Sequence, residues 1–123
     1  MKVAVLDHGM GNLRSVARAL EAAGARVRVT ARPPEISQED ALCVPGQGIF
    51  GRCMQSLSSS GLDDMLREWL ASGRPYLGIC LGMQVLFESS EEGPEKGLAI
   101  IEGQVARLPG HVRVPHIGWN TVG

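Results

Sequence analysis

The first apolar positions of the chain form a short run that stops at a polar, glycine-rich turn. Residues 2–7, KVAVLD, are mostly small or β-branched up to Asp7, and HGMGN follows. This pattern is typical of a buried parallel strand that meets a loop. Apolar residues then recur at helical spacing over residues 12–23, with Asn12 as the expected N-cap and Gly24 as the expected end. The pattern therefore predicts strand, turn and helix.

The middle of the chain continues this alternation. Residues 25–31 alternate valine with arginine, which predicts a partly buried strand near a sheet edge. A short apolar strand in ALCVPGQG breaks at Pro45 into a glycine loop. Residues 51–62 give only a weak signal for one or two helical turns, whereas residues 63–72 predict a helix with an acidic start and one apolar face.

The pattern changes in the last third of the chain, after one more strand and helix. Residues 76–80 (YLGIC) predict a strand, residues 81–90 a helix and residues 90–97 a polar loop. Residues 98–108 and 112–122 then predict consecutive strands with no helix between them. This order predicts an α/β fold with a doubly wound, flavodoxin-like, mostly parallel sheet and a mixed or antiparallel extension near the C-terminus.

Length and composition favour a single ordinary globular domain over residues 1–123. The chain is 44% hydrophobic and 20% charged, with a formal net charge of -1, so it offers no basic surface for nucleic acid. No apolar run approaches the roughly 18 residues that cross a bilayer, and the run before Asp7 is too short for a signal peptide. We therefore expect a cytoplasmic protein with no nucleic acid or membrane among its partners.

The three cysteines, Cys43, Cys53 and Cys80, form no CxxC pair. Their odd number and spacing fit neither a disulfide framework nor a zinc site, so reduced thiols are expected, with no metal and no cofactor. Cys43 lies inside an apolar strand and Cys53 in a segment without glycine turns, and we interpret both as buried apolar residues. Only Cys80 has surroundings that suggest chemistry.

The sequence GICLG places Cys80 between Gly78 and Gly82, where the predicted strand becomes a helix. The layout matches the glycine-flanked nucleophile elbow, with cysteine in place of serine. Both glycines are expected because a tight turn brings backbone segments together, and a Cβ on either would collide. The following helix points its first amides at Cys80, which favours the thiolate, and the Leu81 amide can face an oxyanion.

Each glycine turn also has a simpler interpretation. A lone cysteine is more often a buried apolar residue, but the flanking glycines and the strand-to-helix switch favour a nucleophile at Cys80. PGQG can be a plain turn or a loop whose exposed amides line an anion site, and a thiolate in the same sheet favours the second interpretation. GMGNLR lacks the third glycine of a dinucleotide fingerprint and has Arg14 in its place, which argues against nucleotide binding.

Four segments in this order, DHGMGNLRS, PGQGIFG, GICLGMQVLFESSEEG and PHIGWN, resemble those of class I glutamine amidotransferases. The resemblance covers the whole chain and is closest to the glutaminase subunits of imidazole glycerol phosphate synthases, which act in histidine biosynthesis. It implies that Cys80 attacks the side-chain amide of L-glutamine, forms a glutamyl thioester and releases ammonia, after which water frees glutamate. No cofactor is implied.

The resemblance also implies roles by motif position. It implies an oxyanion hole made by the backbone amides of Gly46, Gln47, Gly48 and Leu81. Gln84 would help to hold the substrate. Asn12 and Trp119 would lie near the interface with a cyclase subunit, a (β/α)8 barrel that receives the ammonia in a heterodimer.

Three departures from the family pattern are visible. His8 stands where the family usually has tyrosine, and Gln47 where a small apolar residue is common. The catalytic His-x-Glu expected near the family's C-terminus does not occur in the sequence, and neither His111 nor His116 maps onto it. We therefore expect a truncated domain that lacks its C-terminal part, with negligible glutaminase turnover alone but with Cys80 still open to alkylation.

Two other hypotheses remain at this point. The chain could be a non-catalytic docking or regulatory fragment that keeps the interface motif and binds the cyclase subunit. It could also be another cysteine hydrolase on a flavodoxin-like sheet, for which the elbow is evidence but the other three motifs are not.

Overall fold

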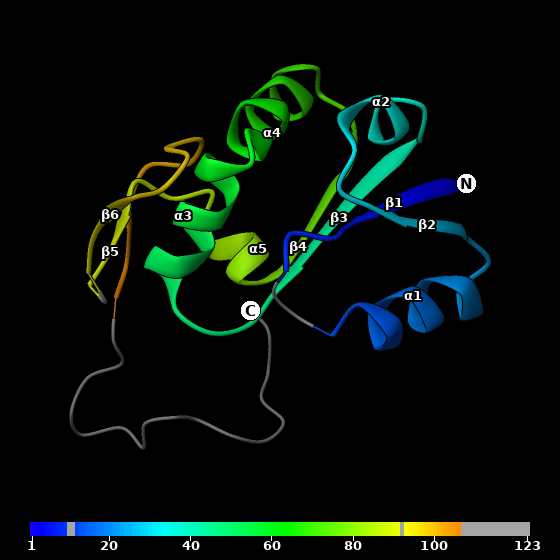
Figure 1. Cartoon of the computed structure of the whole chain (residues 1–123), viewed down its shortest axis with the longest axis horizontal. Helices are drawn as coiled ribbons and strands as arrows, with labels where there is room; N and C mark the ends of the chain where they lie inside the picture. Colours follow the sequence, from blue (N-terminus) through cyan, green and yellow to red (C-terminus); the bar gives the residue numbers. More distant parts are fainter. Residues whose placement is uncertain (10–11, 92, 107–123) are drawn as a thin grey trace.

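The computed structural model describes residues 1–9, 12–91 and 93–106. Its main sheet has four parallel strands in the order β2-β1-β3-β4 (Figure 1). The strands are β1 (Lys2–Leu6), β2 (Arg26–Thr30), β3 (Ala41–Gly46) and β4 (Tyr76–Cys80). The helices are α1 (Leu13–Ala22), α2 (Pro33–Ile36), α3 (Phe50–Ser59), α4 (Leu62–Ala71) and α5 (Leu81–Gln84). The predicted doubly wound, mostly parallel sheet is confirmed.

The two ends of α1 follow the signals in the sequence. The Asn12 side chain accepts a hydrogen bond from the Ser15 amide at 3.2 Å, which satisfies one of the free N–H groups of the first turn. At the other end, Gly24 has a φ of 98° and its amide donates to the Glu21 carbonyl. A left-handed residue after the last turn is readily supplied by glycine, so this helix end is confirmed.

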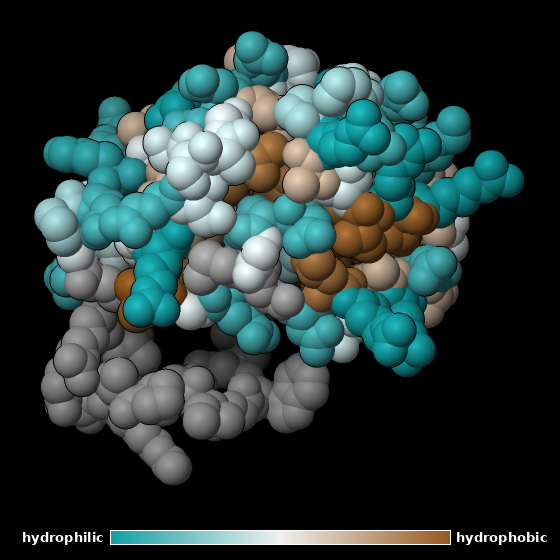
Figure 2. All heavy atoms as spheres, viewed as in Figure 1, coloured by the Kyte–Doolittle hydropathy of each residue, from teal (hydrophilic) through white to brown (hydrophobic). Residues whose placement is uncertain are grey.

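Helices cover both faces of the main sheet (Figure 1). Alternate residues of β1 point to opposite faces, as the strand repeat requires. Val3 and Val5 pack on the α1 side, and Ala4 and Leu6 belong to the larger core beneath α3, α4 and α5. On the face viewed in Figure 2, apolar side chains gather over the region of the main sheet, whereas hydrophilic ones dominate elsewhere.

Three helices differ from the prediction. The weak segment at 51–62 is a full helix, α3, whose inward face includes the buried Leu57. The four-residue α2 was missed because it is too short to show a helical period. The helix after Cys80 ends at Gln84 and not at residue 90, because the Val85 and Leu86 carbonyls accept hydrogen bonds from the amides of residues 98, 100 and 101.

A second, mixed sheet follows α5, with the order β6-β5-β7. Its strands are β5 (Ser89–Ser90), β6 (Gly93–Lys96) and β7 (Gln104–Val105). The expected mixed extension is therefore present, but its predicted parts are misplaced. The polar loop at 90–97 contains β6, and in the described part of the strand predicted at 98–108, residues 98–106, only residues 104–105 form a strand. The strand predicted at 112–122 lies outside the described residues. In the described part of the chain, we find no helix with the length and apolar character needed to cross a membrane.

Candidate active site

Cys80 is the last residue of β4 and directly precedes α5. Its φ of 54° and ψ of -115° place a non-glycine residue in a backbone region that side chains rarely adopt. Such strain persists only where the surrounding structure imposes it, and it is often found at functional sites. The turn leaves Cys80 exposed at the carboxyl end of the strand, the edge of a parallel sheet where ligands bind.

The glycines on either side of Cys80 are required by close backbone contacts. A Cβ at Gly78 would lie 2.5 Å from the Gly82 carbonyl oxygen, and a Cβ at Gly82 would overlap with the carbonyl oxygen of Val44. The Tyr76 hydroxyl donates a hydrogen bond to the same Gly82 carbonyl at 2.5 Å. The first turn of α5 is thus held tightly against β3 and β4, which fixes the position of Cys80.

The PGQG loop begins beside Cys80. In the parallel pairing of β3 with β4, Gly46 lies opposite Cys80. The amides of Gln47 and Gly48 donate no hydrogen bond within the described residues, and Gly48 has a φ of 109°. A pocket of about 210 Å³ joins this loop to the cysteine and is lined by Asn12, Ser15, Val16, Pro45, Gly46, Gln47, Ile79 and Cys80. The structure therefore brings the predicted nucleophile and the predicted anion loop together.

Gln84, the residue assigned to substrate binding, lies at the end of α5. Its Oε1 atom is buried and has no hydrogen-bond partner among the described residues. A buried acceptor without a donor is costly unless a ligand or water supplies one. Gln84 does not line the pocket at Cys80, so its role in holding the substrate stays a prediction.

His8 is a residue near this site that sequence reasoning undervalued. It is buried at the carboxyl end of β1, and its Nε2–H donates a hydrogen bond to the carbonyl of Pro45, the residue that opens the PGQG loop. The signal that could have revealed it is its place two residues after a buried strand, at the edge of the sheet where sites form. His8 is thus hydrogen-bonded to the first residue of the predicted anion loop.

The other two cysteines are buried, as predicted. Burial raises the pKa of the Cys43 thiol and of the Cys53 thiol from 9.0 to about 11. A thiol with so high a pKa stays protonated at neutral pH and is a poor nucleophile. The exposed Cys80 is therefore the one cysteine of the chain that is placed to react.

The two residues assigned to the partner interface have different outcomes. Asn12 lines the pocket at Cys80 while its side chain caps α1, so it lies at the same edge of the sheet as the nucleophile. Trp119 lies outside the described residues, as do His111 and His116. Among the described residues, no group of three or more His, Cys, Asp or Glu side chains could hold a metal ion.

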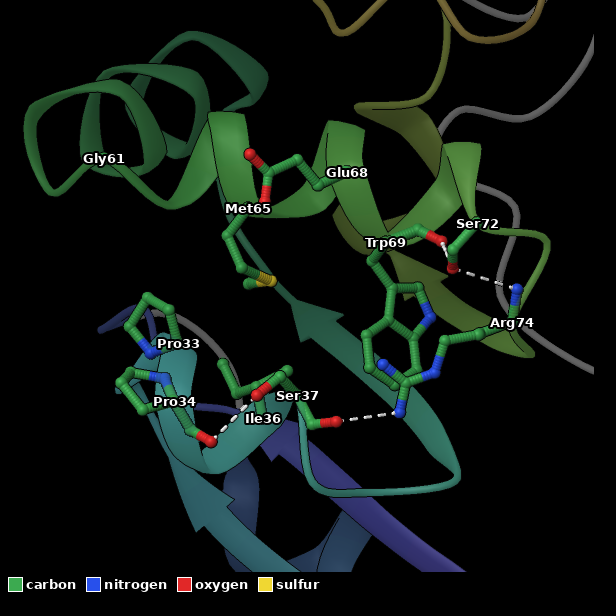
Figure 3. A pocket seen from close by; sticks show the side chains of 10 residues that line it. All are labelled: Pro33, Pro34, Ile36, Ser37, Gly61, Met65, Glu68, Trp69, Ser72 and Arg74. Carbon is green, nitrogen blue, oxygen red and sulfur yellow. Dashed lines mark hydrogen bonds between the residues drawn. The ribbon is translucent and has the colours of Figure 1, made fainter.

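A larger pocket, of about 490 Å³, lies near the start of β4 between α2 and α4 (Figure 3). The Arg74 guanidinium stacks at 3.7 Å over the Trp69 ring and donates to the Ser37 carbonyl at 3.1 Å. The Trp69 indole donates to the Pro75 carbonyl. These polar groups are engaged in joining α2 to the α4–β4 turn, and the pocket lies at the opposite end of β4 from Cys80. We therefore place the site in the smaller pocket.

The family model for class-I glutamine amidotransferases matches residues 4–121. The chain belongs to the class-I glutamine amidotransferase family. The strained turn at Cys80 and the adjoining glycine loop thus lie within a glutamine amidotransferase domain.

Curated relatives of this amidotransferase domain include proteins named imidazole glycerol phosphate synthase subunit HisH. The protein of Nostoc punctiforme is 49% identical over 120 residues, which cover 96% of this chain and 57% of the relative. That of Symbiobacterium thermophilum is 49% identical over 122 residues, with 98% and 58% covered. The chain therefore spans somewhat more than half of the length of these relatives.

Solved structures agree with the fold. A crystal structure described as a glutamine amidotransferase superposes with a TM-score of 0.72 and 26% identity, covering 85% of this chain and 56% of that one. A protein described as a putative peptidase E from Listeria monocytogenes EGD-e superposes with a TM-score of 0.61 and 21% identity, covering 71% and 50%. The second likeness shows the fold alone.

Proposed function

We propose that this amidotransferase chain forms the glutaminase site of an imidazole glycerol phosphate synthase and acts on L-glutamine. The observation that carries the proposal is the strained, exposed Cys80 lying opposite Gly46, so that a nucleophile and an amide-rich loop meet at one edge of the sheet. The family match supports glutamine as the substrate, and relatives with the synthase subunit name, about half identical to this chain, support the choice of synthase.

In the proposed reaction, the Cys80 sulfur attacks the side-chain carbonyl carbon of glutamine. A carbon–sulfur bond forms as the thiol gives up its proton, and the carbonyl oxygen takes the negative charge. The carbon–nitrogen bond then breaks as the nitrogen takes up one proton, and ammonia leaves. Water attacks the resulting thioester, which frees glutamate and restores the thiol. The leaving nitrogen needs a proton donor, and the sequence contains no His-x-Glu to which that role can be assigned.

The surrounding residues would serve binding and charge stabilisation. We propose that the oxyanion is stabilised by the backbone amides of Gln47, Gly48 and Leu81, and not by that of Gly46, which is paired with β4. The Gln84 Oε1 atom, buried without a donor, would accept a hydrogen bond from the substrate. Asn12 lines the same pocket.

We further propose that the ammonia passes to a cyclase subunit with a (β/α)8 barrel, in a cytoplasmic heterodimer with both hydrolase and lyase activity. Asn12 and Trp119 would contribute to the interface with this partner. Support comes from the synthase subunit names of the relatives and from the position of Asn12 beside the candidate nucleophile. No cofactor is needed for this chemistry.

The decisive test is alkylation of the chain by a chloromethyl ketone analogue of L-glutamine, because covalent capture of the thiol needs no proton donor for ammonia. The sulfur forms a bond to the methylene carbon, and chloride leaves. Intact mass and peptide mapping should show one adduct, on Cys80, at a rate that saturates with reagent concentration. L-glutamine should slow the reaction, and L-asparagine at the same concentration should not.

A Cys80→Ser variant is the matched control and should take up no adduct. Labelling of Cys43 or Cys53 in preference to Cys80, or equal protection by L-asparagine, would contradict the proposed glutamine site.

A further inference from the structure

Strand β3, which leads into the PGQG loop, extends beyond the end of its pairing with β1. The pairing of β1 with β3 ends at Val5 opposite Cys43, whereas β3 stays paired with β4 as far as Gly46. The carbonyl of Pro45 therefore lies beyond the last backbone pair between β1 and β3. The His8 side chain fills this place and donates its Nε2–H to the Pro45 carbonyl.

This hydrogen bond fixes the proton on the His8 ring. A carbonyl oxygen can only accept, so Nε2 must carry the hydrogen, and in the neutral ring Nδ1 then has a bare lone pair. The Nδ1 atom is buried and has no partner among the described residues. The ring therefore has one specific bond here, and that bond is to the loop.

The main chain of His8 is held as well. The Ser56 hydroxyl, on α3, donates to the His8 carbonyl at 2.8 Å. Helix α3 follows the PGQG loop directly, so residue 8 is bonded both to Pro45 before the loop and to the helix after it. The loop is thus anchored at both ends through His8.

Holding the Pro45 carbonyl also fixes the point from which the PGQG loop leaves the sheet. The peptide unit between Pro45 and Gly46 is planar, and in the trans form its C=O and N–H point in opposite directions. A Cβ at Gly46 would lie 3.5 Å from His8 Cε1 and 2.9 Å from Leu81 Cβ, so the ring and the elbow enclose this backbone. The Gly46 amide therefore points towards β4, with which it is paired, and the first free amides of the loop are those of Gln47 and Gly48.

We propose that His8 is a positioning residue of the glutaminase site, which holds the start of the PGQG loop, and with it the amides of Gln47 and Gly48, through the Pro45 carbonyl and does not touch the substrate. The inference rests on the proposed function, in which this loop stabilises the oxyanion. It predicts that loss of the Nε2 donor slows attack on a carbonyl group while binding of the glutamine skeleton is unchanged.

The experiment compares His8→Gln, whose amide nitrogen can take the place of Nε2, with His8→Met, which has similar length but no donor. The chloromethyl ketone analogue of glutamine is the probe, because its ketone oxygen gains negative charge as the thiolate adds. The maximal alkylation rate of His8→Met should fall about tenfold, with the half-saturating concentration unchanged, while His8→Gln should stay within roughly threefold of the parent chain.

Iodoacetamide, whose displacement reaction creates no oxyanion, should modify Cys80 equally fast in all three proteins. A parent-like maximal rate in His8→Met, or equal losses in both variants, overturns the positioning role. If the parent chain itself shows no saturable alkylation at Cys80, the proposed function fails instead, so the two failures are distinguishable.

If circular dichroism shows that His8→Met is unfolded, His8→Asn replaces it in the comparison, because the shorter asparagine amide cannot reach the position of Nε2.

Discussion

At the scale of single residues, Cys80 combines exposure with a strained backbone. The sequence predicted a tight turn from its flanking glycines, and the contacts of Gly78 and Gly82 explain why that prediction succeeded. The role of His8 could not be predicted in the same way. Its hydrogen bond to Pro45 joins residues 37 positions apart, and no local pattern in the sequence records such a contact.

The strain at Cys80 predicts an unusual order of stability between two variants. Glycine normally destabilises a folded chain relative to alanine, but it tolerates a positive φ without steric cost. At a φ of 54° and ψ of -115°, we expect Cys80→Gly to be more stable than Cys80→Ala by on the order of 1 kcal/mol. Urea denaturation of both proteins measures this difference, and a more stable alanine variant would show that the turn is unstrained.

At the scale of elements, local pattern predicted the parts whose stability is local. The strands of the main sheet and the caps of α1 follow hydrophobic period and end signals. Helix α5 and the second sheet do not, because the amides of residues 97–101 take the carbonyls of residues 85–88 and prevent the helix from continuing. Tertiary hydrogen bonding overrides propensity there, and a single sequence does not show it.

The second sheet also makes a specific contact with the start of α3. The Glu95 carboxylate, on β6, accepts a hydrogen bond from the Gln55 amide at 3.2 Å, and a Cβ at Gly51 in the first turn would lie 2.5 Å from Glu95 Oε2. A negative charge at a helix N-terminus is stabilising, so Glu95→Gln should lower the free energy of unfolding by about 0.5–1 kcal/mol. Urea denaturation of both proteins at low salt measures this difference in free energy. If the difference is equally large in about 1 M salt, its origin is not electrostatic.

At the scale of the whole molecule, the site lies at the carboxyl edge of the main sheet, between the two cores. Val3, Val5 and Cys43 pack on the α1 side, and Cys53 belongs to the core beneath α3. The sheet therefore carries an exposed thiol at its edge, while the thiols of the two cores, Cys43 on β3 and Cys53 on α3, are buried. Doubly wound folds place ligands at this edge, which is why the approximate location of the site could be predicted from the order of elements alone.

The buried thiols predict how stability changes at alkaline pH. Because burial raises the pKa of Cys43 and of Cys53 from 9.0 to about 11, each thiol ionises more easily in the unfolded chain. Their contribution is fully present below pH 9 and is lost as pH rises towards 11, by on the order of 2–3 kcal/mol for each thiol. Burial also raises the pKa of the Tyr76 phenol, which adds to the loss above pH 10.

Variants separate these contributions. Urea denaturation between pH 8 and 11 should show a shallower decline for Cys43→Val and for Cys53→Ala than for the parent chain, and Tyr76→Phe should change only the part above pH 10. The decline of each protein is measured from its own free energy of unfolding at pH 8, so a lower starting stability caused by the substitution does not affect the comparison. A decline as steep in the double cysteine variant as in the parent would mean that other groups, and not these thiols, control the alkaline stability of the domain.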